Sequence, residues 1–458
     1  MMTEQPADLV VTGATCVATM DAERRELSGG WVAITGGFVT EVGTGPPPPA
    51  TETLDATDCL VTPGLVNTHH HLFQNLTRAH PEMTDKPLFG WLRSLYPRWR
   101  ALDAEAAYLS AWVGLAELAL SGCTTSTDHL YVHPRGAGDL LTAEIEAAGD
   151  LGMRFHPTRG SMSLSEKDGG LPPDEIVADD DEILAASEAA VDRHHDRSFG
   201  AMVQIALAPC SPFTVTESLM VRSAELAERL DVRLHTHFAE NAEDDAYSLA
   251  QFGCRPTDYL DRTGWLNDRA WLAHCVMPND GEVTRLGRAG VGVAHCPSSN
   301  LILSSGIAPI VPLRRAGVDV GLGVDGSSSN DAASLWLEAR QAMLLAKLRD
   351  GAAAGSARIA LEMATLSGAA CLGRRGELGV LVPGAVGDVA VWPLTGPAFA
   401  GAIADPLEAW LRCGPVMARH TIVHGRVVVR DGVLTHPDTA ARLTAHRREA
   451  TRIQADPS

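Results

Sequence analysis

Short apolar runs alternate with Ala-, Leu- and Glu-rich stretches from residue 63 onward, and this repeat limits the possible fold more than any other feature. Segments of helical composition at residues 104–121, 216–230, 257–263 and 332–349 separate the runs. Such alternation predicts a parallel sheet covered by helices. The eight runs of strand type end near Asn67, Asp128, His156, Pro209, His237, His274, His295 and Asp325. Eight repeats over about 320 residues are typical of a closed (β/α)8 barrel with insertions. An open doubly wound sheet is the alternative, which the lack of a glycine-rich phosphate loop disfavours.

Strand-like segments also occur outside this repeat, near both ends of the chain. Residues 9–13 and 30–34 have this pattern, as do residues 388–392 and 420–429. We therefore expect an α/β fold, a distorted (β/α)8 TIM barrel with a small β-sandwich domain built from both termini. The predicted division is residues 1–62 and 383–458 for the β-sandwich domain and residues 63–382 for the barrel.

Composition excludes several classes of function. The formal net charge of the 458-residue chain is -20, which opposes binding to nucleic acid and to strongly anionic substrates. No apolar run reaches the 18 or so residues that a membrane span needs, and the first residues lack the pattern of a secretory signal. The nine cysteines have no CxxC spacing, which argues against a disulfide framework or a structural cysteine zinc site. We expect a cytoplasmic protein with a small-molecule substrate.

Metal-binding side chains occur at the ends of five of the eight runs. These residues are His69 with His71, Asp128 with His129, His235 with His237, His274, and Asp325. Strand side chains alternate, so His69 and His71 point to the same side and can bind one ion, whereas His70 faces away. For His-x-His alone, a solvated loop cluster is the alternative. The carboxyl ends of barrel strands form the catalytic face, which favours a metal centre here.

A long insertion at residues 72–103 follows the first run, where barrels carry active-site loops. It contains two aromatic clusters, at residues 88–92 and 95–99. The insertion is expected to form a lid over an apolar substrate, with ordinary packing against the barrel wall as the alternative.

Seven motifs carry a resemblance to a known family: NTHHHLFQNLTRA (67–79), LFGWLRSLY (88–96), SGCTTSTDHLY (121–131), APCSPF (208–213), HTHFAEN (235–241), VAHCPSSN (293–300) and GLGVDGSSSND (321–331). The chain resembles the amidohydrolase superfamily. More narrowly, it is similar to the bacterial 8-oxoguanine deaminases, the triazine hydrolases and the hydroxyatrazine ethylaminohydrolases. The resemblance implies a metal held by His69, His71, His237 and Asp325, with Glu240 and His274 as proton-handling groups.

Three imidazoles and one carboxylate suit Zn²⁺, or Fe²⁺ as the alternative. Superfamily members with two metals carry a carboxylated lysine at the end of strand four, but this run ends in Ala-Pro-Cys at residues 208–210. One Zn²⁺ per chain is therefore expected. Guanine deaminases have an arginine near that position, so Cys210 makes guanine itself a less favoured substrate.

The expected chemistry is attack of hydroxide on a ring carbon, because a bound metal lowers the pKa of water from about 15.7 toward 7. Asp325 would accept the proton of the water as well as bind the metal. Glu240 would deliver a proton to the ring nitrogen of the substrate. His274 would hydrogen-bond the attacking oxygen.

Four further residues are candidates for substrate contact: Gln74, Trp91, His129 and Cys210. Each has a simpler alternative, namely a satisfied loop amide for Gln74, packing for Trp91 and an inert buried thiol for Cys210. His235 is expected to support the metal ligands, not to bind the metal itself.

The function predicted from these features is hydrolytic deamination of an oxidised purine, 8-oxoguanine to urate plus ammonia. Two alternatives use the same attack on an electron-poor ring carbon: an s-triazine amino- or chlorohydrolase, and an isoxanthopterin or other pterin deaminase. A non-enzymatic scaffold would be expected to lack ligands, and the sequence retains all of them. The resemblance also implies a homo-oligomer.

Overall fold

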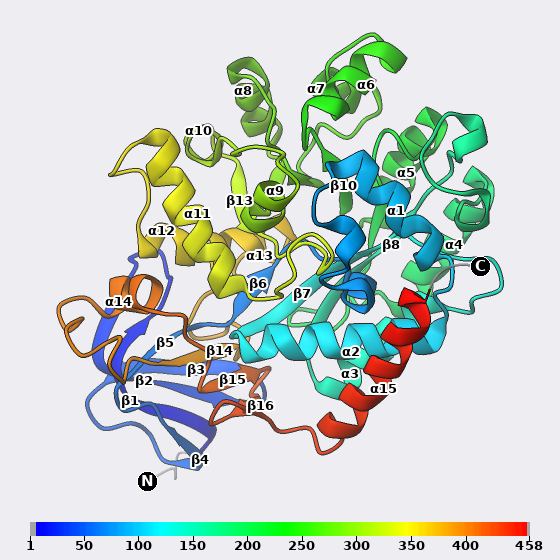
Figure 1. Cartoon of the computed structure of the whole chain (residues 1–458). Helices are drawn as coiled ribbons and strands as arrows, with labels where there is room; N and C mark the ends of the chain where they lie inside the picture. The colour runs from blue at the N-terminus through cyan, green and yellow to red at the C-terminus, as the bar shows by residue number, and fades with distance from the viewer. Residues whose placement is uncertain (1–5, 456–458) are drawn as a thin grey trace.

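The computed structural model describes residues 6–455, and within them eight parallel strands close into a barrel, as predicted. The strands, in barrel order, are β6 (Leu65–Asn67), β7 (Cys123–Leu130), β8 (Arg154–Ser161), β9 (Ala206–Pro209), β10 (Leu234–Phe238), β11 (Ala270–His274), β12 (Gly292–His295) and β13 (Asp319–Leu322). Helices surround the barrel in Figure 1, and a buried apolar cluster fills the space between the strands and these helices.

Most of the predicted strand ends agree with the structure. Asn67, Pro209, His274 and His295 are each the last residue of a barrel strand. Two ends differ: β8 passes His156 and continues to Ser161, and β13 already ends at Leu322, so Asp325 lies in the following loop.

Two pairs of neighbouring barrel strands are joined by the shortest ladders, with one pair of facing residues each. Leu322 faces Asn67 between β13 and β6, and Leu234 faces Leu207 between β10 and β9, as the single paired residues of their ladders. These two junctions divide the barrel into one half of β6–β9 and another of β10–β13.

The helices follow the predicted alternation. Their bounds are α1 (Leu88–Trp99), α2 (Ala104–Leu120), α3 (Leu140–Leu151), α4 (Asp180–His194), α5 (Glu217–Leu230), α6 (Ala242–Phe252), α7 (Pro256–Arg262), α8 (Asp280–Ala289), α9 (Pro297–Ile302), α10 (Ile310–Arg315), α11 (Leu335–Asp350), α12 (Ala357–Glu362), α13 (Gly368–Cys371), α14 (Pro406–Cys413) and α15 (Thr439–Gln454). Side-chain caps define several starts; for example, the Asp103 carboxylate accepts a hydrogen bond from the backbone N–H of Ala106 at the start of α2.

The predicted β domain from both termini is confirmed. Its strands are β1 (Ala7–Ala18), β2 (Glu26–Thr35), β3 (Phe38–Thr44), β4 (Ala50–Asp55), β5 (Cys59–Pro63), β14 (Val389–Pro393), β15 (His420–Val423), β16 (Arg426–Arg430) and β17 (Val433–Leu434). Hydrogen bonds connect these nine strands of the described chain into one mixed sheet. Along one edge of β1, β4 pairs with the first half and β5 with the second half, on either side of a bulge between Val11 and Ala14. An apolar cluster with members from both terminal segments forms the interior.

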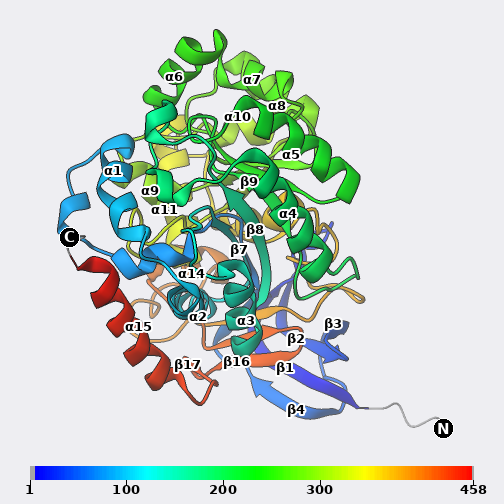
Figure 2. The same ribbon diagram turned by 90° about the vertical axis from the view of Figure 1, so that its right-hand side faces the viewer.

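The insertion after β6 folds into two short 3₁₀ helices, η1 (Leu72–Thr77) and η2 (Pro81–Met83), followed by α1. The last helix, α15, leaves the sheet and packs against η1 and α2, as Figure 2 shows at the side of the molecule. Its Ile453 is buried in the apolar cluster that α1 forms. None of the helices within residues 6–455 combines the length and the apolar character that crossing a membrane requires.

Candidate metal centre and active site

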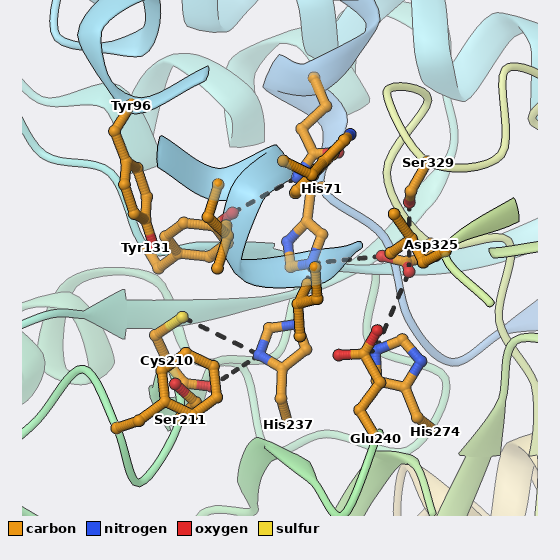
Figure 3. Close-up of a pocket in the computed structure, with 16 residues that line it drawn as sticks. His71, Tyr96, Tyr131, Cys210, Ser211, His237, Glu240, His274, Asp325 and Ser329 are labelled. Atoms are coloured by element: carbon orange, nitrogen blue, oxygen red, sulfur yellow. Dashed lines mark hydrogen bonds and ion pairs between the residues drawn. The ribbon is translucent and has the colours of Figure 1, made fainter. Parts of the chain in front are cut away.

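The four predicted ligands meet at the carboxyl end of the barrel, and Figure 3 shows three of them, His71, His237 and Asp325. His69 and His71 follow β6, His237 lies on β10, and Asp325 follows β13. The Oδ1 atom of Asp325 is 3.4 Å from His69 Nε2 and 3.3 Å from His71 Nε2. The Nε2 atoms of His71 and His237 are 3.1 Å apart. Tetrahedral ligands about 2.0–2.1 Å from one zinc ion are separated by about 3.3–3.4 Å, which these distances approach.

The tautomers of two histidines also fit a bound cation. His71 Nδ1 donates to the carbonyl of His129 at 2.8 Å, and His237 Nδ1 donates to the carbonyl of Cys210 at 2.6 Å. A carbonyl can only accept, so each Nδ1 carries the proton and each Nε2 presents a lone pair. Two lone pairs facing each other at 3.1 Å repel unless a cation lies between them. The donor set therefore fits a metal ion.

His235 sets the tautomer of the third histidine. Its Nδ1 donates to the carbonyl of Trp271 at 2.7 Å, which leaves its Nε2 as an acceptor. His69 Nδ1 donates to that nitrogen at 2.8 Å, so His69 Nε2 also presents a lone pair to Asp325. His235 thus lies where the sequence predicts, behind a ligand.

Burial and charge keep these groups in the forms that metal binding needs. Desolvation holds the pKa of His69 well below its usual value and lowers that of His237 to about 3, so both rings stay neutral. Burial alone would raise the pKa of Asp325, but the surrounding imidazoles of His69, His274 and His71 hold it well below the ordinary range. The site therefore combines neutral imidazoles with an ionised carboxylate.

The pKa of Glu240 is shifted in the opposite direction to that of Asp325. Burial, with the nearby charge of Asp325, raises its pKa from 4.5 to about 8, so the carboxyl holds a proton at neutral pH. Its Oε1 accepts a hydrogen bond from Ser305 at 3.4 Å, and its Oε2 is 3.6 Å from His274 Nε2. A buried protonated carboxyl beside a reaction centre is suited to act as a general acid.

Backbone conformation and a neighbouring amide orient the remaining catalytic candidates. His274 Nδ1 donates to Asn300 Oδ1 at 3.0 Å, so its Nε2 faces Glu240 and Asp325. His274 and Asp325 both have left-handed backbone, with φ of 72° and 60°. Such conformations cost on the order of 1 to 3 kcal/mol in a residue other than glycine and concentrate at functional sites.

A cavity lies above this cluster, with about 400 Å³ of space between protein atoms, part of it open to solvent. Its lining residues are His71, Gln74, Leu88, Trp91, Leu92, Tyr96, Tyr131, Cys210, Ser211, Phe213, His237, Glu240, His274, Leu303, Asp325 and Ser329. Four of them come from α1, which confirms that the insertion after β6 covers the site. Among the described residues that line the cavity, none is a lysine or an arginine, so the walls favour an uncharged, flat ring.

Three of the four predicted substrate-contact residues, Gln74, Trp91 and Cys210, line this cavity. The indole N–H of Trp91 donates to the carbonyl of Ser328 at 3.0 Å, so only its ring face can contact a substrate. His129, the fourth, does not line the cavity. Its Nε2 donates to the carbonyl of Ala208 at 3.1 Å, and its backbone carbonyl accepts the hydrogen bond from His71 Nδ1. It lies behind the ligands and supports them.

Sequence reasoning missed several residues of the site, including Tyr96, Tyr131 and Asn300. The signal for Tyr96 was present, because Leu88, Leu92 and Tyr96 recur at helical spacing and so share one face of α1. Tyr131 and Asn300 had no comparable signal, since Tyr131 is an ordinary loop residue after β7 and Asn300 lies within the short helix α9.

The barrel and the metal-type cluster together define a metal-dependent hydrolase, and comparison specifies its family. The chain belongs to the amidohydrolase family, whose model matches residues 60–428, and it is a deaminase of that family that acts on C–N bonds. It is 48% identical to the 8-oxoguanine deaminase of Pseudomonas aeruginosa, over 96% of this chain and 98% of that protein. It is 35% identical to the hydroxydechloroatrazine ethylaminohydrolase of Pseudomonas sp. strain ADP, over 92% and 90%. The crystal structure of atrazine chlorohydrolase from Arthrobacter aurescens TC1 complexed with zinc matches with a TM-score of 0.92 and 33% identity, covering 96% of this chain and all of that one.

Proposed function

We propose that this deaminase converts 8-oxoguanine and water to urate and ammonia, with one zinc ion per chain. The observation that carries the proposal is the buried, protonated Glu240 carboxyl next to His274 and Asp325, on the floor of a cavity without cationic side chains. The similarity to an 8-oxoguanine deaminase along nearly the whole chain supports the substrate. Zinc is supported by the zinc complex of a related structure and by the ligand set.

We assign each residue of the site a separate role in the reaction. His69, His71, His237 and Asp325 would hold the ion, which supplies a Lewis acid that generates hydroxide from water at neutral pH. The Glu240 carboxyl donates its proton to the ring nitrogen beside the amino-bearing carbon, which makes that carbon more electrophilic. His274 would hydrogen-bond the attacking oxygen through its Nε2, which faces Glu240 and Asp325. Asp325 would take the proton that the attacking water loses and pass it to the amino group, which leaves as ammonia and restores the ring.

The cavity also admits the alternatives that share this chemistry. A triazine or a pterin is a flat, uncharged ring with an electron-poor carbon, and the relatives named above include two enzymes with triazine names. One pocket contact changes substrate preference by only about 1 to 3 kcal/mol, so the choice between these rings depends on a few side chains. We propose that three residues of the cavity wall contact the substrate: Gln74, Trp91 and Cys210.

Ammonia release from a panel of rings tests the proposal. Zinc-loaded enzyme should release ammonia from 8-oxoguanine faster than from guanine, isoxanthopterin or hydroxyatrazine. Glu240→Gln should abolish turnover and retain the metal, whereas Glu243→Gln, at an exposed position on α6, should leave both unchanged. Rapid turnover of hydroxyatrazine without turnover of 8-oxoguanine would assign the enzyme to the triazine group.

Metal analysis tests the stoichiometry separately and should give one zinc ion per chain. The cytoplasmic location, the homo-oligomer and the domain boundaries at residues 62 and 382 stay predictions.

A further inference from the structure

The hydroxyl group of Tyr96 is an unused hydrogen-bonding group in the wall of the cavity. Tyr96 lies on α1 and is 1% exposed. Its hydroxyl oxygen has no hydrogen-bond partner among residues 6–455, although the side chain lines the cavity. Burying a polar group without a partner costs about 1 to 3 kcal/mol, so such groups are rare in folded proteins. A partner on a bound ligand would explain this one.

The position of Tyr96 relative to the reactive groups limits what that partner can be. In Figure 3, Tyr96, Tyr131 and Cys210 form one wall of the cavity, and Asp325, Glu240 and His274 form the wall across from it. A ring whose amino-bearing carbon lies beside Glu240 therefore presents its opposite end to the wall that carries Tyr96.

Most other polar atoms of the cavity wall already have partners within the protein. The Tyr131 hydroxyl accepts from Gln74 Nε2 at 3.4 Å, and the Ser211 and Thr214 hydroxyls are 2.9 Å apart. The remaining unpaired atom is Gln74 Oε1, which packs against Gly326. Tyr96 is thus the residue on its wall whose hydroxyl has no partner at all within residues 6–455, whereas the Tyr131 oxygen already accepts from Gln74. Burial also raises the pKa of Tyr96 well above its usual value, so the proton stays on the oxygen.

We propose that the Tyr96 hydroxyl donates a hydrogen bond to a carbonyl oxygen at the end of the substrate ring opposite the amino group, and thereby selects oxidised over unoxidised purines. In 8-oxoguanine that position carries the 8-oxo group, whereas guanine has a C–H there and leaves the hydroxyl buried without a partner. A site built to hydrogen-bond an oxygen discriminates strongly against an analogue that lacks it. This inference rests on the proposed function, because it takes the deaminated carbon to be the one beside Glu240.

Binding of the two purines to variants tests the inference without turnover. In zinc-loaded Glu240→Gln protein, calorimetry should give an affinity for 8-oxoguanine at least about 10-fold higher than for guanine. Adding Tyr96→Phe should remove most of that preference, because it should weaken the binding of 8-oxoguanine and leave the affinity for guanine unchanged. A preference that survives Tyr96→Phe, or the lack of any preference before it, would overturn the role of Tyr96.

A matched control separates this role from a structural one. Tyr259, on α7, is also fully buried with an unpaired hydroxyl, but it lies outside the cavity. Tyr259→Phe should leave the purine preference intact, and neither variant should lower the melting temperature, because neither hydroxyl bonds to the protein. A clear loss of thermal stability in Tyr96→Phe with the preference retained would show that the hydroxyl is structural. The two failures can be told apart: if wild-type enzyme releases no ammonia from 8-oxoguanine while the binding preference depends on Tyr96, the proposed function fails and only the role of Tyr96 in binding the 8-oxo group stands.

Discussion

Replacing His235 with phenylalanine should weaken zinc binding although His235 is not a ligand. The His235 ring stacks on Trp271 with ring centroids 4.3 Å apart, and phenylalanine can keep that contact. The substitution removes only the two ring nitrogens. One of them accepts from His69 Nδ1 and the other donates to the carbonyl of Trp271. The variant therefore isolates the hydrogen bonds that set the tautomer of His69.

The size of the effect follows from burial. His69 and His235 are both 0% exposed, so water cannot replace the lost acceptor. Leaving His69 Nδ1–H unpaired costs about 1 to 3 kcal/mol, and moving its proton to Nε2 would block the nitrogen that faces the metal. Loss of a hydrogen-bond partner of a metal-bound histidine typically weakens metal affinity 10- to 100-fold, or about 1.4 to 2.7 kcal/mol. We expect a decrease within that range.

Competition for zinc against a chromophoric chelator at fixed pH measures this affinity without reference to activity. His156→Phe is the matched control, because His156 is also buried near Trp271 and neither of its nitrogens has a partner within the described chain. That control should bind zinc like the wild type. If the zinc affinity of His235→Phe were also within twofold of the wild-type value, the hydrogen bonds of His235 would have no role in metal binding.

Two further substitutions test other parts of the structure. A Cβ atom on Gly326 would lie 1.8 Å from Gln74 Oε1, so Gly326→Ala should displace the Gln74 side chain and raise KM for the substrate; an unchanged KM would remove Gln74 from the binding site. Asp128 and Glu144 are fully buried, and desolvation raises both pKa values, that of Asp128 to about 8. The folded state then holds more protons than the unfolded state, so stability should fall as pH rises from about 4 to 8. Glu144→Gln should reduce this loss in urea unfolding at pH 5 and pH 8, in contrast to the exposed Glu146→Gln; equal pH slopes for both variants would contradict the assignment.

The periodic features of the fold and site were predictable from sequence because they depend on local patterns. Strand alternation predicted that His69 and His71 share one side, which they do although both follow the end of β6, and runs of apolar residues located most strand ends, including that of His274. The role of His235 also followed, since it shares a face with His237 but lies deeper in the barrel.

The remaining features depend on tertiary contacts that local patterns do not encode. His129 resembles a ligand in sequence, yet its ring bonds to the carbonyl of Ala208 on a neighbouring strand. Asp325 reaches the site from a loop with left-handed backbone, which no periodicity predicts. The importance of Tyr96 is a statement about a missing partner, and only the packed structure shows which hydroxyl groups lack one.

The two short junctions of the barrel would give the proposed metal centre a mechanical role. His69 and His71 belong to the half formed by β6–β9, whereas His237 and Asp325 belong to the half formed by β10–β13. An ion held by these four residues bridges both seams, at the places where the strand ladders have a single facing pair. Its binding free energy then contributes to barrel closure as well as to chemistry. The four proposed ligands would then hold the two half-barrels together as well as prepare the reaction.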